Sequence, residues 1–277
     1  MCSDSEQIMN DAILLLEKGD LKGAIDAALR LVKTNPTNVT ARTFLFELSC
    51  FSGEWDRADK QLDMIGHQDA NAMMGSLIFR QNFKAERDRI EFFEKGLRPE
   101  AMTKFPDHVE DLIRANEAFR EGRGGEAREM LDRVEEERPA YPCKVNGESF
   151  SDFRDYNDLT MCVFEVIVKD VYAWLPFDQV ERIEFLERKS LRDIFWPQAK
   201  VETTNGTNGE MFLPSLYVNT WKHADDQVRL GRTVDWRDAG DDIFVGEGTR
   251  LFWMDGRDLP ILDIKTIEFD HGETGAV

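Results

Sequence analysis

The stretch from Phe212 to Trp236 combines several side chains whose types could do chemistry. It reads FLPSLYVNTWKHADDQVRLGRTVDW and holds one histidine, three aspartates, two arginines and a lysine. A carboxylate pair such as Asp225 and Asp226 is what a glycosidase-like hydrolase needs, because one acid protonates the leaving group while the other acts as base or nucleophile. Adjacent residues on a strand face opposite ways, so these two carboxylates would converge only in a loop.

The same charges also suit a structural role. Asp225, Asp226 and Asp235 have the opposite sign to Arg229 and Arg232, and could form an ion-pair network that braces a small domain. Neighbouring acids are also expected by chance in a chain whose formal net charge is −19. We therefore favour structural bracing, and keep a carboxylate-dependent hydrolase at Asp225 and Asp226 as an alternative.

Other catalytic arrangements have no counterpart in the sequence. There is no G-x-S-x-G motif, no H-E-x-x-H motif and no Walker loop, and the four histidines are isolated from one another. Gly246-Glu-Gly248 lacks the third glycine and the following helix of a dinucleotide site. The sequence thus predicts a protein that is not an enzyme and has no cofactor and no metal.

The composition of the chain limits the classes of partner that we expect it to bind. A chain with a net charge of −19 repels phosphate backbones, so we expect no nucleic-acid partner. No apolar stretch approaches the roughly 20 residues of a membrane span, and the first residues do not resemble a signal peptide. The four cysteines are far apart and form no C-x-x-C pair. We expect a cytoplasmic protein with no membrane segment, and the sequence leaves its oligomeric state open.

The first 140 residues have the apolar spacing of helices, with punctuation at a fixed period. Gly19 and Gly53 are 34 residues apart, and an alanine follows each of them by five residues. Gly122, Ala127 and Pro139 repeat the offsets of Gly19, Ala24 and Pro36. A 34-residue period of paired helices is typical of the tetratricopeptide repeat. We expect helices over 5–17, 20–34, 37–52, 55–66, 70–95, 106–121 and 124–137, with an irregular helical bundle as the alternative.

Repeats of this kind stack into a curved solenoid whose concave face commonly receives a peptide or a helix. The first helix of each pair lines that face. The residues expected there are Thr40, Thr43, Glu47, Met74, Leu77 and Gln81. Met74 and Leu77 could anchor an amphipathic helix there, but for either of them taken alone we favour a place in the core. A chain this acidic favours a partner segment that carries basic residues.

After Pro139 the pattern changes to short runs of strand-forming residues separated by turn signals. Residues 142–158 have the composition of a linker. Strand-forming runs cover 161–168, 171–174, 183–185, 201–204, 211–218, 250–254, 261–264 and 266–269, and we expect about seven strands with little helix. Asn205–Gly209 and Asp255-Gly256 predict hairpin turns, and Ser190 with Asp193 predicts a short helix. The expected fold is multidomain, with all-α tetratricopeptide-like hairpins in 1–140 and a strand-rich α+β domain in 141–277.

Three motifs give the C-terminal half a family resemblance. They are SLRDIFW from Ser190 to Trp196, FLPSLY from Phe212 to Tyr217, and RLGRTVDW from Arg229 to Trp236, preceded by Asp225-Asp226. Together they resemble the ImpE/TagJ family, also called SciE-type proteins, which are accessory proteins of type VI secretion systems. The matching residues, which we regard as domain-defining, are Leu191, Arg192, Asp193, Pro214, Tyr217, Asp226, Arg229, Gly231, Arg232, Asp235 and Trp236.

The resemblance implies a two-domain architecture and a non-enzymatic role. It further implies a partner, the N-terminal helix of the small sheath subunit TssB, and a link to the ClpV unfoldase that recycles the sheath. A general protein-interaction scaffold with an unrelated partner remains the alternative. Neither the motifs nor the repeats indicate whether such a protein promotes assembly or disassembly of the sheath.

Overall fold

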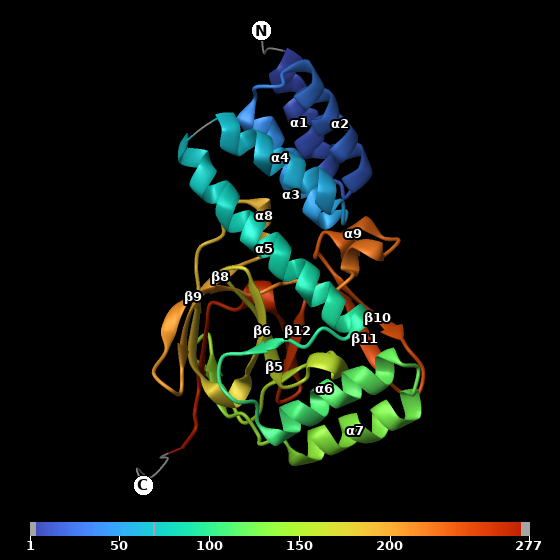
Figure 1. Cartoon of the computed structure of the whole chain (residues 1–277), viewed down its shortest axis with the longest axis vertical. Helices are drawn as coiled ribbons and strands as arrows, with labels where there is room; N and C mark the ends of the chain where they lie inside the picture. Colours follow the sequence, from blue (N-terminus) through green and yellow to red (C-terminus); the bar gives the residue numbers. More distant parts are fainter. Residues whose placement is uncertain (1–3, 69, 273–277) are drawn as a thin grey trace.

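Seven helices fill the first half of the computed structural model, which describes residues 4–68 and 70–272. Four of them lie together at one end of the molecule, at the top of Figure 1, and the strands lie below them. The helices are α1 Asp4–Glu17, α2 Leu21–Thr34, α3 Val39–Phe51, α4 Trp55–Gln68, α5 Ala70–Lys95, α6 Asp107–Arg120 and α7 Gly124–Glu137. Each agrees within about two residues with the helix predicted from the sequence, so the helical part of the fold class is confirmed.

The repeated glycines and alanines have the roles that their spacing predicts. Gly19, Gly53 and Gly122 all have positive φ, at +84°, +70° and +76°, where glycine avoids the strain that a Cβ atom would introduce. Ala24 and Ala58 have no exposed surface, which lets the paired helices approach closely. These turns form the helical hairpins α1–α2, α3–α4 and α6–α7.

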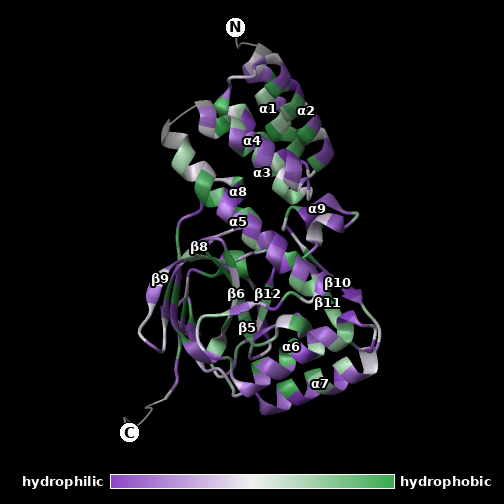
Figure 2. Cartoon of the chain, viewed as in Figure 1, coloured by the Kyte–Doolittle hydropathy of each residue, from purple (hydrophilic) through white to green (hydrophobic). Residues whose placement is uncertain are grey.

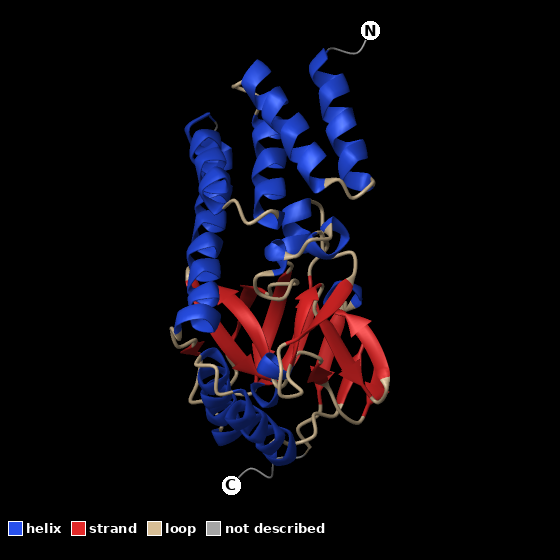
Figure 3. Cartoon of the chain, turned by 90° about the vertical axis from the view of Figure 1, so that its right-hand side faces the viewer, coloured by secondary structure: helices blue, strands red, loops and turns tan. Residues whose placement is uncertain are grey.

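The third hairpin does not stack directly on the first two. Helix α5 has 26 residues and runs from α4 down along the strands, and α6–α7 lies at the opposite end of the molecule (Figure 1). The strands therefore lie between α1–α4 and the α6–α7 hairpin (Figure 3). The sequence of α5 explains this arrangement, because the 34-residue period places Arg87 and Phe92 where the other hairpins have their glycine and alanine. The helix therefore continues to Lys95, just before Gly96 at φ +83°.

Nine strands of the described chain form one sheet in the order β1-β6-β5-β9-β8-β7-β14-β2-β3. The pairs are antiparallel apart from β1 with β6, which is parallel. The strands are β1 Glu100–Ala101, β2 Cys143–Val145, β3 Glu148–Phe150, β5 Val163–Val168, β6 Val171–Pro176, β7 Val180–Phe185, β8 Gln198–Thr203, β9 Asn208–Phe212 and β14 Thr266–Phe269.

Two smaller sheets complete the strand-rich half. One pairs β10 Val234–Asp238 with β11 Phe244–Gly248, and the other has the order β13-β12-β4. The latter strands are β13 Arg257–Pro260, β12 Leu251–Met254 and β4 Arg154–Asp155. The short helix predicted at Ser190 is confirmed as α8 Leu191–Phe195, and a second one, α9, spans Asp226–Arg229.

Several expectations for the second half were wrong in detail. Residues 142–158 are not a linker, because they contain β2, β3 and β4. The strand expected at 261–264 is instead a 3-10 turn, η4 Ile261–Asp263, directly after β13. In place of the expected seven strands, the described chain has thirteen between Cys143 and Phe269, and nine of these have only two to five residues. Short strands of two to five residues are hard to predict because they span too few positions to show an alternation of apolar and polar residues.

The core of the strand-rich half is aromatic. Phe153, Phe164, Phe177 and Phe252 are almost fully buried, and their ring centroids lie 4.5–6.4 Å apart. A second aromatic group joins the helices to the strands. There, Phe195 and Trp196 beside α8 contact rings of Phe51, Trp55, Phe79 and Phe83 on α3, α4 and α5.

Candidate functional site

Asp225 and Asp226 act as helix caps. The Asp225 carboxylate accepts a hydrogen bond from the backbone N–H of Gln227 at 2.8 Å, which caps the start of α9. Asp226 reaches a different helix, since its Oδ2 accepts from the backbone N–H of Leu21 at 3.0 Å, at the start of α2. Its Oδ1 accepts from Arg229 at 2.9 Å. This geometry favours the bracing role expected from the sequence over a catalytic pair.

Arg232 completes the contact between this segment and the first hairpin. Its guanidinium donates to the carbonyl oxygens of Leu16, at 2.7 Å, and Glu17, at 3.1 Å, at the end of α1. Gly231, at φ +67°, brings the chain close to the Leu216 side chain. The segment from Asp226 to Arg232 therefore contacts the ends of α1 and α2, which lie more than 200 residues away in the sequence.

The remaining motif residues make contacts within the strand-rich half, and Arg192 also contacts the helices. Asp193 accepts from the backbone N–H of Ser190 at 3.0 Å and so caps α8, which begins at the half-buried Leu191. The Arg192 guanidinium lies 4.9 Å from the centre of the Phe79 ring. Asp235 lies 3.3 Å from His223, and the Trp236 ring lies 5.7 Å from that of Tyr217. Pro214, three residues before Tyr217 in the sequence, is buried.

A cluster of buried charges joins α5 to the strands, and sequence reasoning did not find it. Arg89 on α5 donates two hydrogen bonds of 2.9 Å to the Glu165 carboxylate on β5 and another to Glu86. Arg250 contacts Oε2 of the same Glu165 carboxylate and also pairs with Asp155. Bidentate arginine–carboxylate pairs are strong because two parallel hydrogen bonds form at once.

Hydrogen bonds from uncharged side chains complete this cluster. The Tyr217 hydroxyl donates to Asp155 at 2.8 Å, and the Tyr172 hydroxyl donates to Glu165 at 2.6 Å. Burial by itself would raise the pKa of Glu165, but Arg89 and Arg250 lower it to about 2. In Asp155 the effect of burial is larger than that of Arg250, so its pKa is raised. The one signal for this cluster in the sequence is Glu165 itself, a charge within an apolar strand, which requires a buried partner.

The six residues expected to line a concave face occupy different environments. Thr40, Met74, Leu77 and Gln81 are exposed, and Thr43 is half-buried. Glu47 is buried, with its carboxylate 3.4 Å from Arg192 of α8. Burial raises the pKa of Glu47 to about 7, although Arg192 opposes the shift. Helix α8 therefore covers the part of α3 where Glu47 lies.

Exposed apolar side chains gather where α4 meets α5. A surface groove of about 230 Å³ is lined there by Leu62, Asp63, Gly66, His67, Met73, Ser76, Leu77 and Arg80. Met74 is 66% exposed and Leu77 is 46% exposed, and Met64, Met73 and Ile78 are also exposed. In Figure 2 the part of α5 nearest α4 is coloured white to green. We call this surface the α4–α5 groove.

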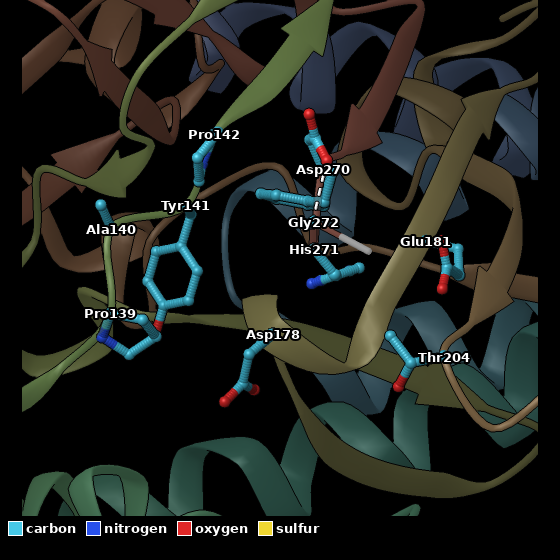
Figure 4. Close-up of a pocket in the computed structure, with 11 residues that line it drawn as sticks. Pro139, Ala140, Tyr141, Pro142, Asp178, Glu181, Thr204, Asp270, His271 and Gly272 are labelled. Carbon is cyan, nitrogen blue, oxygen red and sulfur yellow. Dashed lines mark hydrogen bonds between the residues drawn. The ribbon is translucent and has the colours of Figure 1, made fainter. Parts of the chain in front are cut away.

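A larger cavity, of about 670 Å³, lies at the other end of the molecule. Tyr141, Asp178 and His271 reach it from three separate segments (Figure 4). His271 is hydrogen-bonded to the carbonyl oxygen of Val180 at 2.6 Å, and Tyr141 to His108 at 3.1 Å. Burial raises the pKa of the Tyr141 hydroxyl, which keeps it neutral. Both side chains therefore make hydrogen bonds within the fold, which favours a structural role for them.

Among the described residues, no group of three or more histidine, cysteine, aspartate or glutamate side chains is arranged to hold a metal ion. None of the helices within 4–68 and 70–272 is long and apolar enough to cross a membrane. Cys50, Cys143 and Cys162 are free thiols, and all three are buried.

The fold and these contacts define a class of protein in which helical hairpins are fixed onto a strand-rich region by a buried charge cluster and by helix caps. The family model described as ImpE protein matches residues 147–268. The chain is 31% identical over 256 residues to the type VI secretion system accessory component TagJ of Pseudomonas aeruginosa, which covers 92% of this chain and 90% of that protein. The chain belongs to the ImpE family, as its motifs predicted.

The fold is also that of a solved structure. The crystal structure of protein VPA1032 from Vibrio parahaemolyticus superposes with a TM-score of 0.87 at 23% sequence identity. The match covers 95% of this chain and 98% of the other. The predicted fold class, helical hairpins followed by a strand-rich region, is confirmed.

Proposed function

We propose that this protein is a non-enzymatic accessory component of a bacterial type VI secretion system and acts in the cytoplasm as an adaptor. The observation that carries the proposal is the similarity to TagJ over nine-tenths of both chains. Its partner is the N-terminal helix of a TssB-like small sheath subunit. The link to the ClpV unfoldase is indirect and runs through the sheath. Neither nucleic acid nor membrane takes part.

The α4–α5 groove is the surface that best fits such a helix. An amphipathic helix docks by inserting apolar side chains at positions i, i+3, i+4 and i+7 into an apolar groove. Methionine suits this role, because its unbranched and polarizable side chain adapts to the shape of a partner. Three methionines, Leu77 and Ile78 are exposed on or beside this groove.

The other residues expected from the sequence to line a concave face lie at different distances from the proposed contact. Gln81 is exposed one turn beyond Leu77 on α5 and extends the contact surface with a polar side chain. Thr40 and Thr43 lie on α3, whereas the lining of the α4–α5 groove comes from α4 and α5. Glu47 is buried against Arg192, so it acts on the arrangement of α3 and α8 and not on the partner directly.

Calorimetric titration with a peptide of the cognate sheath subunit's N-terminal helix tests this proposal. We expect saturable binding to the full chain. We also expect Leu77→Glu to weaken binding by about tenfold or more, because placing a carboxylate in an apolar contact costs about 1–3 kcal/mol. Leu97→Glu is the matched control, since Leu97 is a leucine of similar exposure, 42% against 46%, outside the groove.

Two outcomes would contradict the proposal. If wild-type protein binds no peptide at high micromolar concentration, the sheath helix is not the partner, and a general scaffold with an unrelated partner becomes the better interpretation. If Leu77→Glu and Leu97→Glu weaken binding equally, the helix binds elsewhere. For the hydrolase alternative, a folded Asp226→Asn variant that abolishes a measured turnover would show that the non-enzymatic role is wrong.

A further inference from the structure

One segment of the strand-rich half touches the turns of both N-terminal hairpins. Residues 219–232, which we call the bracing loop, contain η3 Thr220–Lys222 and α9. In Figure 1 α9 lies directly below the lower ends of α2 and α3. The bracing loop lies within the stretch from Phe212 to Trp236, and none of its residues belongs to the α4–α5 groove.

The polar contacts of the bracing loop match the charges at the helix ends. Asp226 places a carboxylate at the start of α2, where free N–H groups give the helix a partial positive charge. Arg232 places its guanidinium at the end of α1, where free carbonyl groups give a partial negative charge. The two side chains therefore hold the α1–α2 turn from both sides.

The close packing of the loop follows the 34-residue period. An added Cβ atom on Gly19 would lie 1.8 Å from the Gln227 amide nitrogen, and one on Gly53 would lie 2.3 Å from the Trp221 ring. Equivalent turns of two consecutive hairpins thus each lie against a side chain of the same loop. At Gly122, the corresponding turn of α6–α7, there is no atom within 4 Å of such a Cβ.

We infer that Trp221, Asp226 and Arg232 are positioning residues that set the orientation of α1–α4 relative to the sheet. Helix α4 begins just after the turn that Trp221 contacts, and α4 forms one wall of the α4–α5 groove. Through that wall the bracing loop holds the groove in the shape that receives a helix. This last link rests on the proposed function, whereas the orientation of the hairpins does not.

The test compares two double variants of equal charge change. Asp226→Asn with Arg232→Gln removes both charges from the polar contacts to the α1–α2 turn. Glu148→Gln with Arg257→Gln is the control, because these residues pair with each other on β3 and β13, outside the bracing loop. Spin labels at Lys33→Cys on α2 and Lys200→Cys on β8, in a Cys2→Ser background, report the distance between hairpin and sheet. Trp221→Ala is measured in the same way.

We expect one narrow distance distribution for wild type and the control, and a broadened one for Asp226→Asn/Arg232→Gln and for Trp221→Ala, with unchanged helical content. We also expect the Kd of the sheath peptide to rise by about threefold or more in Trp221→Ala. Unchanged distances in both variants would overturn the inference. A broadened distribution with an unchanged Kd would overturn the link to the groove. If wild type binds no peptide, the proposed function fails, and the distances alone decide the inference.

Discussion

The pKa of the Glu47 side chain depends on the packing around it. The sequence places it on the expected inner face of a repeat helix, yet α8 covers it, and burial raises its pKa to about 7. Its pKa in the unfolded chain is close to the ordinary value of 4.5. The folded-state pKa is therefore the higher one, so folding favours the protonated carboxyl. The stability that results is fully present below pH 4.5 and is lost as the pH rises through about 7.

Glu47→Gln is expected to remove this pH dependence. Because the amide cannot ionise, the variant should become more stable than wild type as the pH rises from 5 to 8, by about 1–3 kcal/mol. Chemical denaturation at a series of pH values measures the difference in free energy of unfolding. Glu187→Gln, which removes an exposed carboxylate, is the control for charge alone. A constant difference between Glu47→Gln and wild type across this range would show that Glu47 does not titrate there.

Glycines at equivalent positions of two helical hairpins have different surroundings in the fold. Gly53 and Gly122 both end the first helix of a pair with positive φ, so the sequence pattern treats them alike. Only the structure distinguishes them, because the Trp221 ring lies against Gly53 and Gly122 faces open space. The absence of such punctuation in α5 is equally informative, since it lets this helix continue from the hairpins to the sheet.

Alanine substitutions at Gly53 and Gly122 should separate the cost of backbone strain from the cost of steric contact with the Trp221 ring. Gly122→Ala is expected to cost about 1–2 kcal/mol, because the left-handed backbone is unfavourable for a residue with a Cβ atom. Gly53→Ala should cost about 1–3 kcal/mol more, since the Trp221 ring must move. Thermal unfolding of both variants measures this. In a Trp221→Ala background the difference between the two substitutions should disappear, and its persistence would exclude the ring as the cause.

At the scale of the whole molecule, the helical and strand-rich halves share buried charges. Arg89 on α5 is fully buried against Glu165 of β5, and Arg250 reaches the same carboxylate. Asn116 on α6 likewise donates to the carbonyl oxygen of Leu159 at 2.9 Å. We propose residues 1–140 and 141–277 as two structural domains that depend on one another for folding.

Separating the chain between residues 140 and 141 tests that dependence. A fragment of 141–277 has Glu165 without Arg89, and breaking a buried ion pair by removing one partner costs about 3–5 kcal/mol. We expect the isolated fragment to lack a cooperative thermal transition, and mixing it with 1–140 to restore one. Circular dichroism and near-ultraviolet spectra follow both. A fragment 141–277 that unfolds cooperatively by itself would show that the domains fold independently.

The sequence by itself determined the features that depend on local patterns. Helix positions followed from apolar spacing and from glycine and proline punctuation, hairpin turns from Asn205–Gly209 and Asp255-Gly256, and the family from three motifs. Only the tertiary structure decided which distant residues meet. Arg89 with Glu165, Asp226 with the start of α2, and Trp221 with Gly53 are pairs that no periodicity indicates, because a contact across 76 to 205 residues depends on how helices and strands pack. For the same reason, Asp225, Asp226 and Arg232, which belong to a possible catalytic set in the sequence, bind helix ends in the fold.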